Sequence, residues 1–150
     1  MYISGMDKKT HEICLAHSLR RADRVVSQLY NEYFSPLGIR VTQFSVLRAL
    51  HLMGSTTAAQ IREALVMDQT TVSRALKPLI RDGYIAVAEG ATKREKALSL
   101  TPEGKSLYKQ ALGPWGEAQK MLRKKLGKGK DDVLMDLSRQ IVAIKEWFFY

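Results

Sequence analysis

Residues 69–81 place hydrogen-bond donors and cations on one side of a predicted helix and apolar side chains on the other. The predicted buried stripe consists of Val72, Leu76, Leu79 and Ile80. The opposite side carries no carboxylate and comprises Gln69, Thr70, Ser73, Arg74, Lys77 and Arg81, with Thr71 beside them. Amides and hydroxyls recognise base edges in the major groove, and arginine or lysine binds guanine or phosphate. This side therefore predicts contact with double-stranded DNA, and the alternative is a helix face that meets only solvent.

Two further cations lie in a short segment that follows this helix. Residues 84–89 and 96–100 have the alternating pattern of strands, so with the turn between them they predict a β-hairpin. Lys93 and Arg94 lie near its tip, where cations can enter a narrow minor groove or lie along the phosphates. A hairpin directly after a helix-turn-helix is typical of a winged helix, which makes this hairpin the predicted wing.

Capping residues define the short helices that must hold these groups in place. Thr42 is expected to cap one helix, and Thr57 with Gln60 forms the capping box of a second, about two turns long. Asp68 is placed to cap the third, and Gly83 to end it. The pattern predicts helix, tight turn, helix.

Longer helices with surplus apolar surface flank this region. The first ends before Pro36 and combines a stripe of Leu15, Leu19, Ala22, Val26, Leu29 and Tyr33 with a second apolar flank of Val25, Tyr30 and Phe34. Thr101 opens a fifth helix through about Leu126. A sixth begins near Asp131 and has more apolar surface than a terminal helix usually exposes. These faces predict packing against a second chain.

The composition is that of one ordinary globular domain. The chain has 150 residues, 45% of them hydrophobic, and a formal net charge of +9. A polyanionic partner fits this charge, although simple solubility explains it as well. No stretch approaches the roughly 20 apolar residues that span a bilayer, and the first residues lack the core of a signal peptide. We therefore expect a cytoplasmic protein without a membrane partner.

No residues assemble into a recognisable catalytic centre. The sequence lacks a nucleophile with its base and a glycine-rich phosphate loop, so we expect neither enzymatic activity nor a cofactor. His11, Cys14 and His17 are spaced three residues apart, which turns the outer two roughly 120° from each other on a helix. Because no fourth ligand is evident, we expect no metal site.

Four stretches carry a more specific pattern. They are residues 37–44 (LGIRVTQF), 70–74 (TTVSR), 79–85 (LIRDGYI) and 98–104 (LSLTPEG). Together they resemble the MarR family of bacterial transcriptional regulators over about residues 12–126. The resemblance implies a mainly α fold with a small β-hairpin wing, in which a winged helix-turn-helix joins a helical dimerisation region. The corresponding bounds are 1–36 for the N-terminal dimerisation helix, 37–101 for the DNA-binding domain and 102–150 for the C-terminal dimerisation helices.

The resemblance also implies a mode of action. Such a protein is an obligate homodimer that binds a pseudo-palindromic operator, typically as a repressor, and is released by a small-molecule effector or an oxidant. The family's effector pocket lies between the dimerisation helices and the winged domain. The candidates for lining it are His17, Arg21, Tyr30 and Phe44, a mixture suited to a phenolic anion, with core packing as the alternative for Phe44.

Cys14 is the candidate for a redox switch in place of an effector. Peroxide-sensing members of the family place a reactive cysteine near the start of the first long helix, and Cys14 has a similar position. A thiol near a helix N-terminus is oxidised to sulfenic acid more readily than an ordinary one. The alternative is an incidental thiol.

The wing departs from the family pattern at one position. The usual Asp-Arg-Arg-like triplet reads Thr92-Lys93-Arg94 here, so the minor-groove arginine is retained as Arg94 while its carboxylate partner is replaced. We expect a looser wing, with Glu89 or Glu95 as partial substitutes.

Two other classes of protein share much of this pattern. A nonspecific architectural DNA-binding protein would have the basic charge and the winged helix, but neither an operator preference nor an effector response. A winged helix that binds proteins would not bind DNA.

Overall fold

The structure is a computed structural model that describes residues 14–92 and 94–148, and this part of the chain is mainly helical. In chain order its elements are α1 (Leu15–Phe34), the 3₁₀-helix η1 (Ser35–Leu37), α2 (Val41–Met53), α3 (Ala58–Leu65), α4 (Gln69–Arg81), β1 (Ile85–Glu89), β2 (Lys96–Leu100), α5 (Pro102–Leu126) and α6 (Lys130–Phe148). The predicted fold class, mainly α with a small β-hairpin, is confirmed. No helix in the described part is long and apolar enough to cross a bilayer.

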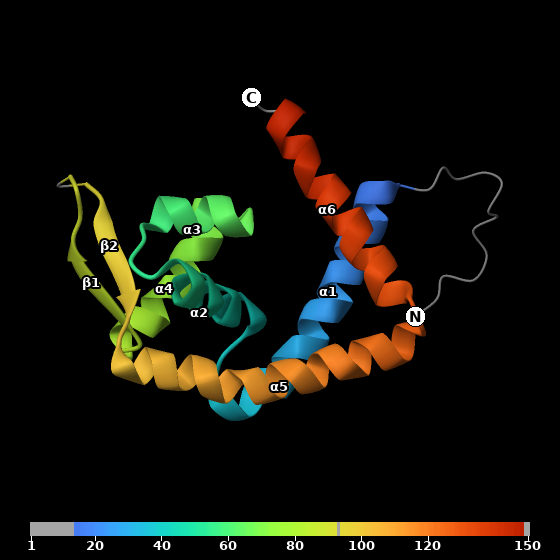
Figure 1. Ribbon diagram of the computed structural model, residues 1–150, viewed down its shortest axis with the longest axis horizontal. Coiled ribbons are helices and arrows are strands. Elements are labelled where there is room, and N and C mark those ends of the chain that lie inside the picture. Colours follow the sequence, from blue (N-terminus) through green and yellow to red (C-terminus); the bar gives the residue numbers. More distant parts are fainter. Residues whose placement is uncertain (1–13, 93, 149–150) are drawn as a thin grey trace.

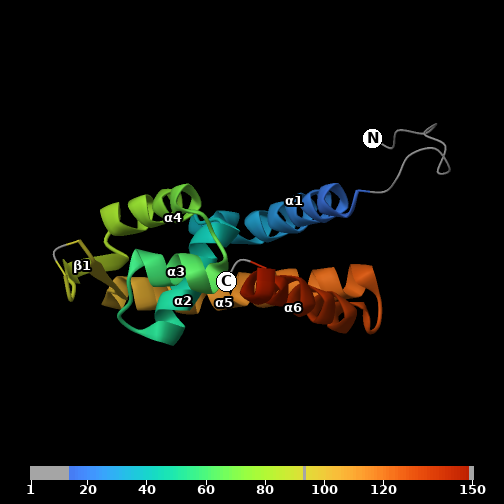
Figure 2. The same cartoon turned by 90° about the horizontal axis from the view of Figure 1, so that it is seen from above.

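Helix α5 runs along the length of the molecule (Figure 1). At one end it carries a group formed by α2, α3, α4 and the hairpin, and at the other end it leads into α6. Helix α1 packs against α5. Although α1 and α6 overlap in Figure 1, Figure 2 places them apart.

One continuous hydrophobic core joins α1, the helix-turn-helix and α5. The Phe34 ring of α1 stacks on Phe44 of α2 with centroids 4.8 Å apart, and Phe44 stacks on Tyr108 of α5 at 5.8 Å. Further fully buried side chains are Val46, Leu47, Leu50, Ile61, Val72 and Leu79. Since burying one large apolar side chain contributes about 1.5–3 kcal/mol, this core fixes the position of α4 relative to α5.

Side-chain caps begin three of the helices where the sequence predicts them. The Thr57 hydroxyl accepts the Gln60 N–H at 3.2 Å, and the Gln60 side chain accepts the Thr57 N–H at 3.0 Å, which completes the capping box. Asp68 caps α4, and Thr101 caps α5. Each cap satisfies backbone donors that have no partner within the helix.

The start of α2 differs from the prediction. Arg40 rather than Thr42 is the N-cap residue, and the helix begins at Val41. The Gln43 side chain accepts the Arg40 N–H, and the Asn31 side chain of α1 accepts the Val41 N–H, both at 2.8 Å. These two acceptors satisfy the first donors of the helix, so a threonine cap is not needed.

The wing is the hairpin of β1 and β2, whose register runs from Ile85 opposite Leu100 to Glu89 opposite Lys96. Tyr84, predicted to begin the first strand, stays outside it. Its N–H donates to the Leu79 carbonyl at 2.8 Å and so belongs to the end of α4. The strand therefore starts one residue later than its alternation indicates.

A β-bridge that the sequence pattern does not predict anchors the wing. Thr56, in the loop between α2 and α3, exchanges two backbone hydrogen bonds with Leu98 of β2, at 3.0 and 2.7 Å. Thr56 is buried, and its hydroxyl donates to the Gln60 side chain at 2.7 Å. The middle of β2 is thus joined to the segment just before α3.

Helices α1 and α6 expose much of their apolar surface. The buried residues of α1 are Tyr30 and Phe34 of the predicted second flank, whereas Leu15 of the predicted main stripe is 81% exposed. This is because α5 covers only one side of α1. The exposed large apolar residues of α6 are Val133, Leu134, Met135, Leu137, Ile141, Val142, Ile144, Trp147 and Phe148.

Candidate nucleic-acid interface

Helix α4 turns its polar side to solvent because its apolar side packs against α2 and α3. Val72 and Leu76 are buried there, and Asp68 fixes the first turn by accepting the Thr71 N–H at 2.7 Å. Thr71 itself is half-buried. The remaining predicted contact residues of this helix are all exposed: Gln69, Thr70, Ser73, Arg74, Lys77 and Arg81. The structure therefore brings these six side chains together on one surface.

Charges on this surface are not equally available. Hydrogen bonds from Thr71 hold the pKa of Asp68 below its usual value, so its carboxylate keeps its charge at the helix N-terminus. Arg81 forms a bidentate ion pair with Asp82, at 3.0 and 3.2 Å. Arg74 and Lys77 form no ion pair in the described part of the chain. These two residues are the cations that α4 offers to an external anion.

The wing continues the surface of α4. Ile80, predicted to belong to the buried stripe, is 38% exposed and lines a groove of about 360 Å³ between α3, α4 and the hairpin. Arg62 of α3 and Arg94 of the wing line the same groove. Lys93, the other cation predicted at the tip, lies outside the described residues. Arg94 and α4 are therefore at two borders of one continuous surface.

Hydrogen bonds shape the end of the hairpin. The Lys96 ammonium donates to the Glu89 carboxylate across the strands at 2.9 Å. The Glu95 N–H donates to the Thr92 hydroxyl at 3.3 Å, so this threonine accepts a turn hydrogen bond in the position where the family pattern has a carboxylate. Gly90 is required next to it, because a β-carbon there would collide with the Glu95 carbonyl.

The four residues predicted to line an effector pocket do not gather in one place. His17 and Arg21 are exposed near the start of α1, whereas Tyr30 lies near its end, about 20 Å from His17 at the helical rise per residue. Burial raises the pKa of Tyr30, although the positive charge of Arg123 lowers it in part. The Tyr30 hydroxyl donates to the Gln119 side chain of α5. Phe44 is 3% exposed and belongs to the core stack.

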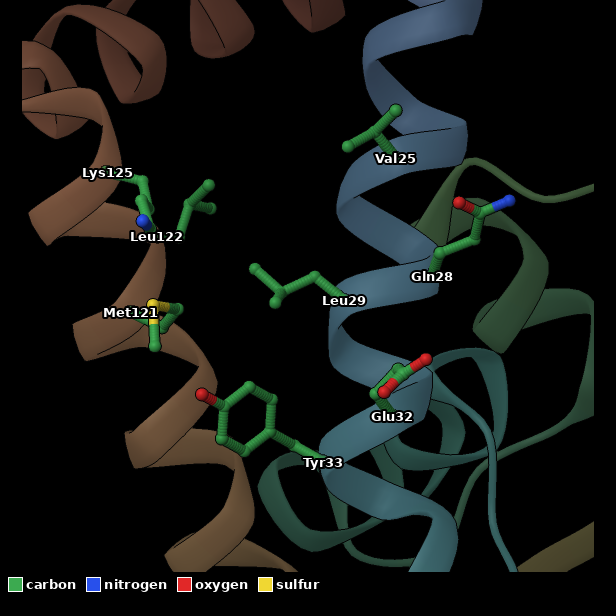
Figure 3. Close-up of a pocket in the computed structure, with 8 residues that line it drawn as sticks. All are labelled: Val25, Gln28, Leu29, Glu32, Tyr33, Met121, Leu122 and Lys125. Carbon is green, nitrogen blue, oxygen red and sulfur yellow. The ribbon is translucent and has the colours of Figure 1, made fainter.

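A cavity does lie between α1 and α5, but other residues line it. Its volume is about 690 Å³. Figure 3 shows Leu29 and Tyr33 of α1 pointing toward α5. The lining consists of Val25, Gln28, Leu29, Glu32, Tyr33, Met121, Leu122 and Lys125. The apolar stripe of α1 was the available signal for these residues, since periodicity identifies a helix face without saying whether it meets core, cavity or partner.

Cys14 is the N-cap residue of α1. Its sulfur accepts the His17 N–H at 3.4 Å, and the residue is exposed. His11, which with Cys14 and His17 was expected to form no metal site, lies outside the described residues. The thiol is thus accessible and lies at the helix N-terminus, as its sequence position indicates.

Comparisons with known proteins agree with this arrangement. Residues 37–95 match the model of the MarR family. An uncharacterized HTH-type transcriptional regulator of Bacillus subtilis, YwoH, is 32% identical over 96 residues, which are 64% of this chain and 70% of that protein. The matches to the multiple antibiotic resistance protein MarR of two Salmonella species are shorter and span 58% of those proteins.

Two solved structures extend the similarity to nearly the whole chain. The M. tuberculosis transcriptional regulator MOSR in complex with DNA superposes with a TM-score of 0.77 and 28% identity, covering 89% of this chain and 97% of that one. A mutant of MarR from E. coli complexed with operator DNA gives a TM-score of 0.75 and 25% identity, covering 85% and 92%.

Proposed function

We propose that this chain, which belongs to the MarR family of transcriptional regulators, is a sequence-specific DNA-binding repressor and acts as a homodimer. In this proposal α4 enters the major groove and Arg94 of the wing reaches the adjacent minor groove. The observation that carries it is the exposed side of α4, on which amide and hydroxyl donors accompany Arg74 and Lys77, neither of which forms an ion pair in the described part of the chain.

The donor types on α4 favour reading of sequence over simple attraction to phosphate. Gln69 can make a bidentate contact to adenine, and Arg74 to guanine, whereas threonine and serine donate to either bases or phosphates. Asp68 holds the N-terminal turn rigid through the Thr71 hydrogen bond, so these side chains project from a fixed backbone. Recognition of specific bases needs side chains held in fixed positions, so this arrangement favours binding to one operator sequence over equal binding to any duplex.

The exposed apolar surface supports a homodimer. Helix α6 buries no residue within the described chain, and its apolar side chains extend over most of its length. A monomer rarely leaves a continuous apolar surface of this extent in water. A second copy that covers α1 and α6 would place two α4 helices on one duplex, where a separation of about 34–36 Å matches successive major grooves.

Release from DNA is proposed to occur through an effector bound between α1 and α5. The cavity there combines the apolar side chains of Leu29 and Leu122 with two charged groups, the Lys125 ammonium and the Glu32 carboxylate. This lining suits a small phenolic acid whose anionic group pairs with Lys125 and whose hydroxyl donates to Glu32. Such a ligand acts by binding better to a dimer whose α4 helices have the wrong spacing. Titration with 4-hydroxybenzoate, using Leu29→Trp to fill the cavity, tests this: binding that persists in the variant contradicts the assignment.

The exposed thiol of Cys14 favours a second candidate for release, by peroxide. The thiolate would attack hydrogen peroxide, forming a sulfur–oxygen bond and releasing hydroxide. Cys14→Ser should then bind DNA as the wild type does and resist peroxide. Release of the variant by peroxide would eliminate this candidate.

The decisive experiment is fluorescence anisotropy with the full chain. The labelled duplex is the DNA upstream of the protein's own gene, measured at near-physiological salt against a scrambled duplex of equal length. We expect a preference above about a hundredfold, within the range of specific regulators. Equal affinities that fall steeply with salt would instead identify a nonspecific architectural protein, and absence of binding would favour a winged helix that binds proteins.

A further inference from the structure

Helix α5 carries a line of lysines on the side that faces solvent. The buried residues of the helix are Gly104, Leu107, Tyr108, Ala111 and Ala118. At about 100° per residue, the opposite side falls within a sector of about 100° and carries Lys105, Lys109, Lys120 and Lys124. All of these lysines are exposed. They are called the lysine face of α5 below.

The charges of the lysine face are available to a partner. None of its lysines takes part in an ion pair in the part of the chain that the structure describes. The other cations of α5 are engaged elsewhere, because Arg123 pairs with Asp131 at 3.0 Å and Lys125 lines the cavity between α1 and α5. The acidic residues of the helix, Glu103 and Glu117, lie beyond one edge of the sector. The face therefore presents positive charge without a balancing carboxylate.

The lysines of this face form two pairs with a gap between them. One pair begins at Lys105 and the other at Lys120, each pair spans about one turn, and the pair centres are about 22 Å apart at the helical rise per residue. Gly113 and Gly116 lie on the same side within the gap, and a β-carbon on either would meet nothing within 4 Å. Because no side chain projects from these two positions, the helix backbone can approach a partner closely there.

This spacing fits the two phosphate backbones of one DNA duplex. The backbones flank a major groove about 12 Å wide, so two lysine pairs about 22 Å apart reach past the groove to the phosphates on both sides of it. The glycines then lie over the groove, where there is no phosphate to bind. An unbroken row of cations would suit a single strand or an acidic peptide better, and a lipid surface would require apolar side chains beside the lysines.

The lysine face is remote from the exposed polar side of α4. Figure 2 shows α4 on one side of the group formed by α2, α3, α4 and the hairpin, and α5 on the other. DNA resists bending over lengths of about 150 base pairs, so a duplex held by α4 cannot also lie along α5 unless it bends sharply. A duplex on the lysine face is therefore a separate segment of DNA.

We propose that the lysine face of α5 is a second DNA-binding surface, which binds the phosphates of a duplex without regard to sequence. The lysine pairs contact the two backbones, and Gly113 and Gly116 let the helix lie close to the groove. While α4 holds one segment of DNA, α5 binds another, so that the protein joins the two. This goes beyond the proposed function, in which only α4 and the wing contact DNA, and binding at α5 requires no operator.

The first test measures binding at α5 in the absence of an operator. The protein is the full chain with Arg74→Ala and Lys77→Ala, which weaken the proposed contacts of α4. The probe is a labelled duplex of scrambled sequence, two helical turns or about 20 base pairs long. Fluorescence anisotropy over a range of salt concentrations gives the affinity, and the backbone amide chemical shifts of Gly113 and Gly116 give the place of binding.

Each lysine pair is removed separately in this background. The two variants are Lys105→Gln with Lys109→Gln, and Lys120→Gln with Lys124→Gln. Their matched control, Arg20→Gln with Arg24→Gln, removes the same charge from exposed positions one turn apart on the polar side of α1. Each pair variant should bind about tenfold more weakly or worse and lower the salt slope by about 2, since each lysine neutralises one phosphate. The control should bind as the background protein does.

A second test measures whether both surfaces bind DNA at once. Beads that carry the DNA upstream of the protein's own gene are loaded with the wild-type chain, washed and exposed to the labelled scrambled duplex. We expect the beads to capture this duplex, and either lysine-pair variant to bind the beads normally but lose the capture. Failure of the proposed function would show as equal loading of beads that carry a scrambled duplex, and it would leave the first test unchanged.

Several results would overturn the proposal. They are absence of saturable binding of the scrambled duplex to the background protein, equal affinity of the pair variants and their control, and shift changes that spare Gly113 and Gly116. Tighter binding of a single strand of the same length, or of vesicles that contain phosphatidylserine, would also overturn the assignment to duplex DNA. Circular dichroism and sedimentation velocity establish that the variants are folded and assembled alike before they are compared.

Discussion

Gly104, in the first turn of α5, lies directly against the carbonyl group of Tyr84, so that a β-carbon on Gly104 would collide with that oxygen. The same carbonyl accepts the Thr101 N–H at 3.1 Å, and the Thr101 hydroxyl donates to the Gly83 carbonyl at 2.6 Å. The backbone at the end of α4 is therefore in direct contact with the backbone at the start of α5. The absence of a side chain at residue 104 is a condition for this contact.

Substitution Gly104→Ala should therefore destabilise the fold. Because the neighbour is backbone, it cannot move aside as a flexible side chain would, and overpacking of this kind costs about 1–3 kcal/mol. Urea unfolding at fixed protein concentration measures the change in the free energy of unfolding. Gly113→Ala in the same helix is the control, since its β-carbon would meet nothing within 4 Å, and it should stabilise by about 0.4–1 kcal/mol. Equal effects of the two substitutions would contradict the close contact.

Asp68 should make stability depend on acid. Its native pKa lies below its usual value because Thr71 donates hydrogen bonds to the carboxylate. Its contribution is therefore fully present above the unfolded-state pKa of about 3.9 and is lost as the pH falls through the lower native value. Asp68→Asn keeps a capping side chain that does not titrate, so the stability difference between wild type and variant should shrink on acidification. A carboxyl NMR titration that places the native pKa above its usual value would contradict this account.

Arg74 and Lys77 should affect DNA binding in different ways. Arg74 lies one helical turn nearer the N-terminal end of α4, where side chains reach base edges, so Arg74→Ala should reduce discrimination by about 1–3 kcal/mol per affected base pair. Lys77→Ala should weaken binding to all duplexes alike and reduce the salt slope by about 1. Anisotropy with a panel of single-substitution operators measures both. An equal loss of selectivity in the two variants would refute the assignment.

Arg94 should matter for affinity even without the usual carboxylate partner. It is exposed at the wing tip and borders the same groove as Ile80 of α4. Arg94→Ala should weaken operator binding by about 1–3 kcal/mol. Arg24→Ala, which removes a positive charge from the exposed polar side of α1, should leave the affinity unchanged. Unchanged affinity of Arg94→Ala in a folded dimer would exclude the wing contact.

Helix α6 should be necessary for the dimer. Leu137 and Ile141 lie one turn apart and are both about half exposed in the single chain. Replacing both with glutamate places two unpaired charges in an apolar interface, and buried unpaired charges strongly lower the free energy of association. Sedimentation velocity should then detect monomers, and operator affinity should fall. Gln140→Glu on the same helix is the control, and dimers that persist in the double variant would refute the role of this face.

The exposed polar side of α4 was predictable from the sequence because its signals are local. The Thr57 capping box, the Asp68 cap and the Thr101 cap involve partners three residues away, and hydrogen bonds at that distance depend only on helix geometry. The polar side of α4 follows from the positions of Val72 and Leu76, since the two sides of a helix are set by its period.

The remainder depends on contacts between distant parts of the chain. Asn31 of α1 supplies the acceptor that moves the start of α2 away from Thr42, and the bridge between Thr56 and Leu98 joins segments 42 residues apart. Periodicity also cannot say which flank of α1 the core will cover. Tyr30 of the second flank is buried, whereas Leu15 of the main stripe is exposed. The role of each exposed site residue and the three-part division of the chain stay predictions.

The two backbone hydrogen bonds between Thr56 and Leu98 keep the wing from turning independently of the helix-turn-helix. The middle of β2 is bound to the segment before α3, and Thr101, which follows β2, is hydrogen-bonded to Gly83 and Tyr84 at the end of α4. The helix-turn-helix and the wing are therefore expected to move together as one rigid unit. In the proposed dimer, a changed spacing between the two operator half-sites should therefore lower the affinity more than a changed minor-groove width.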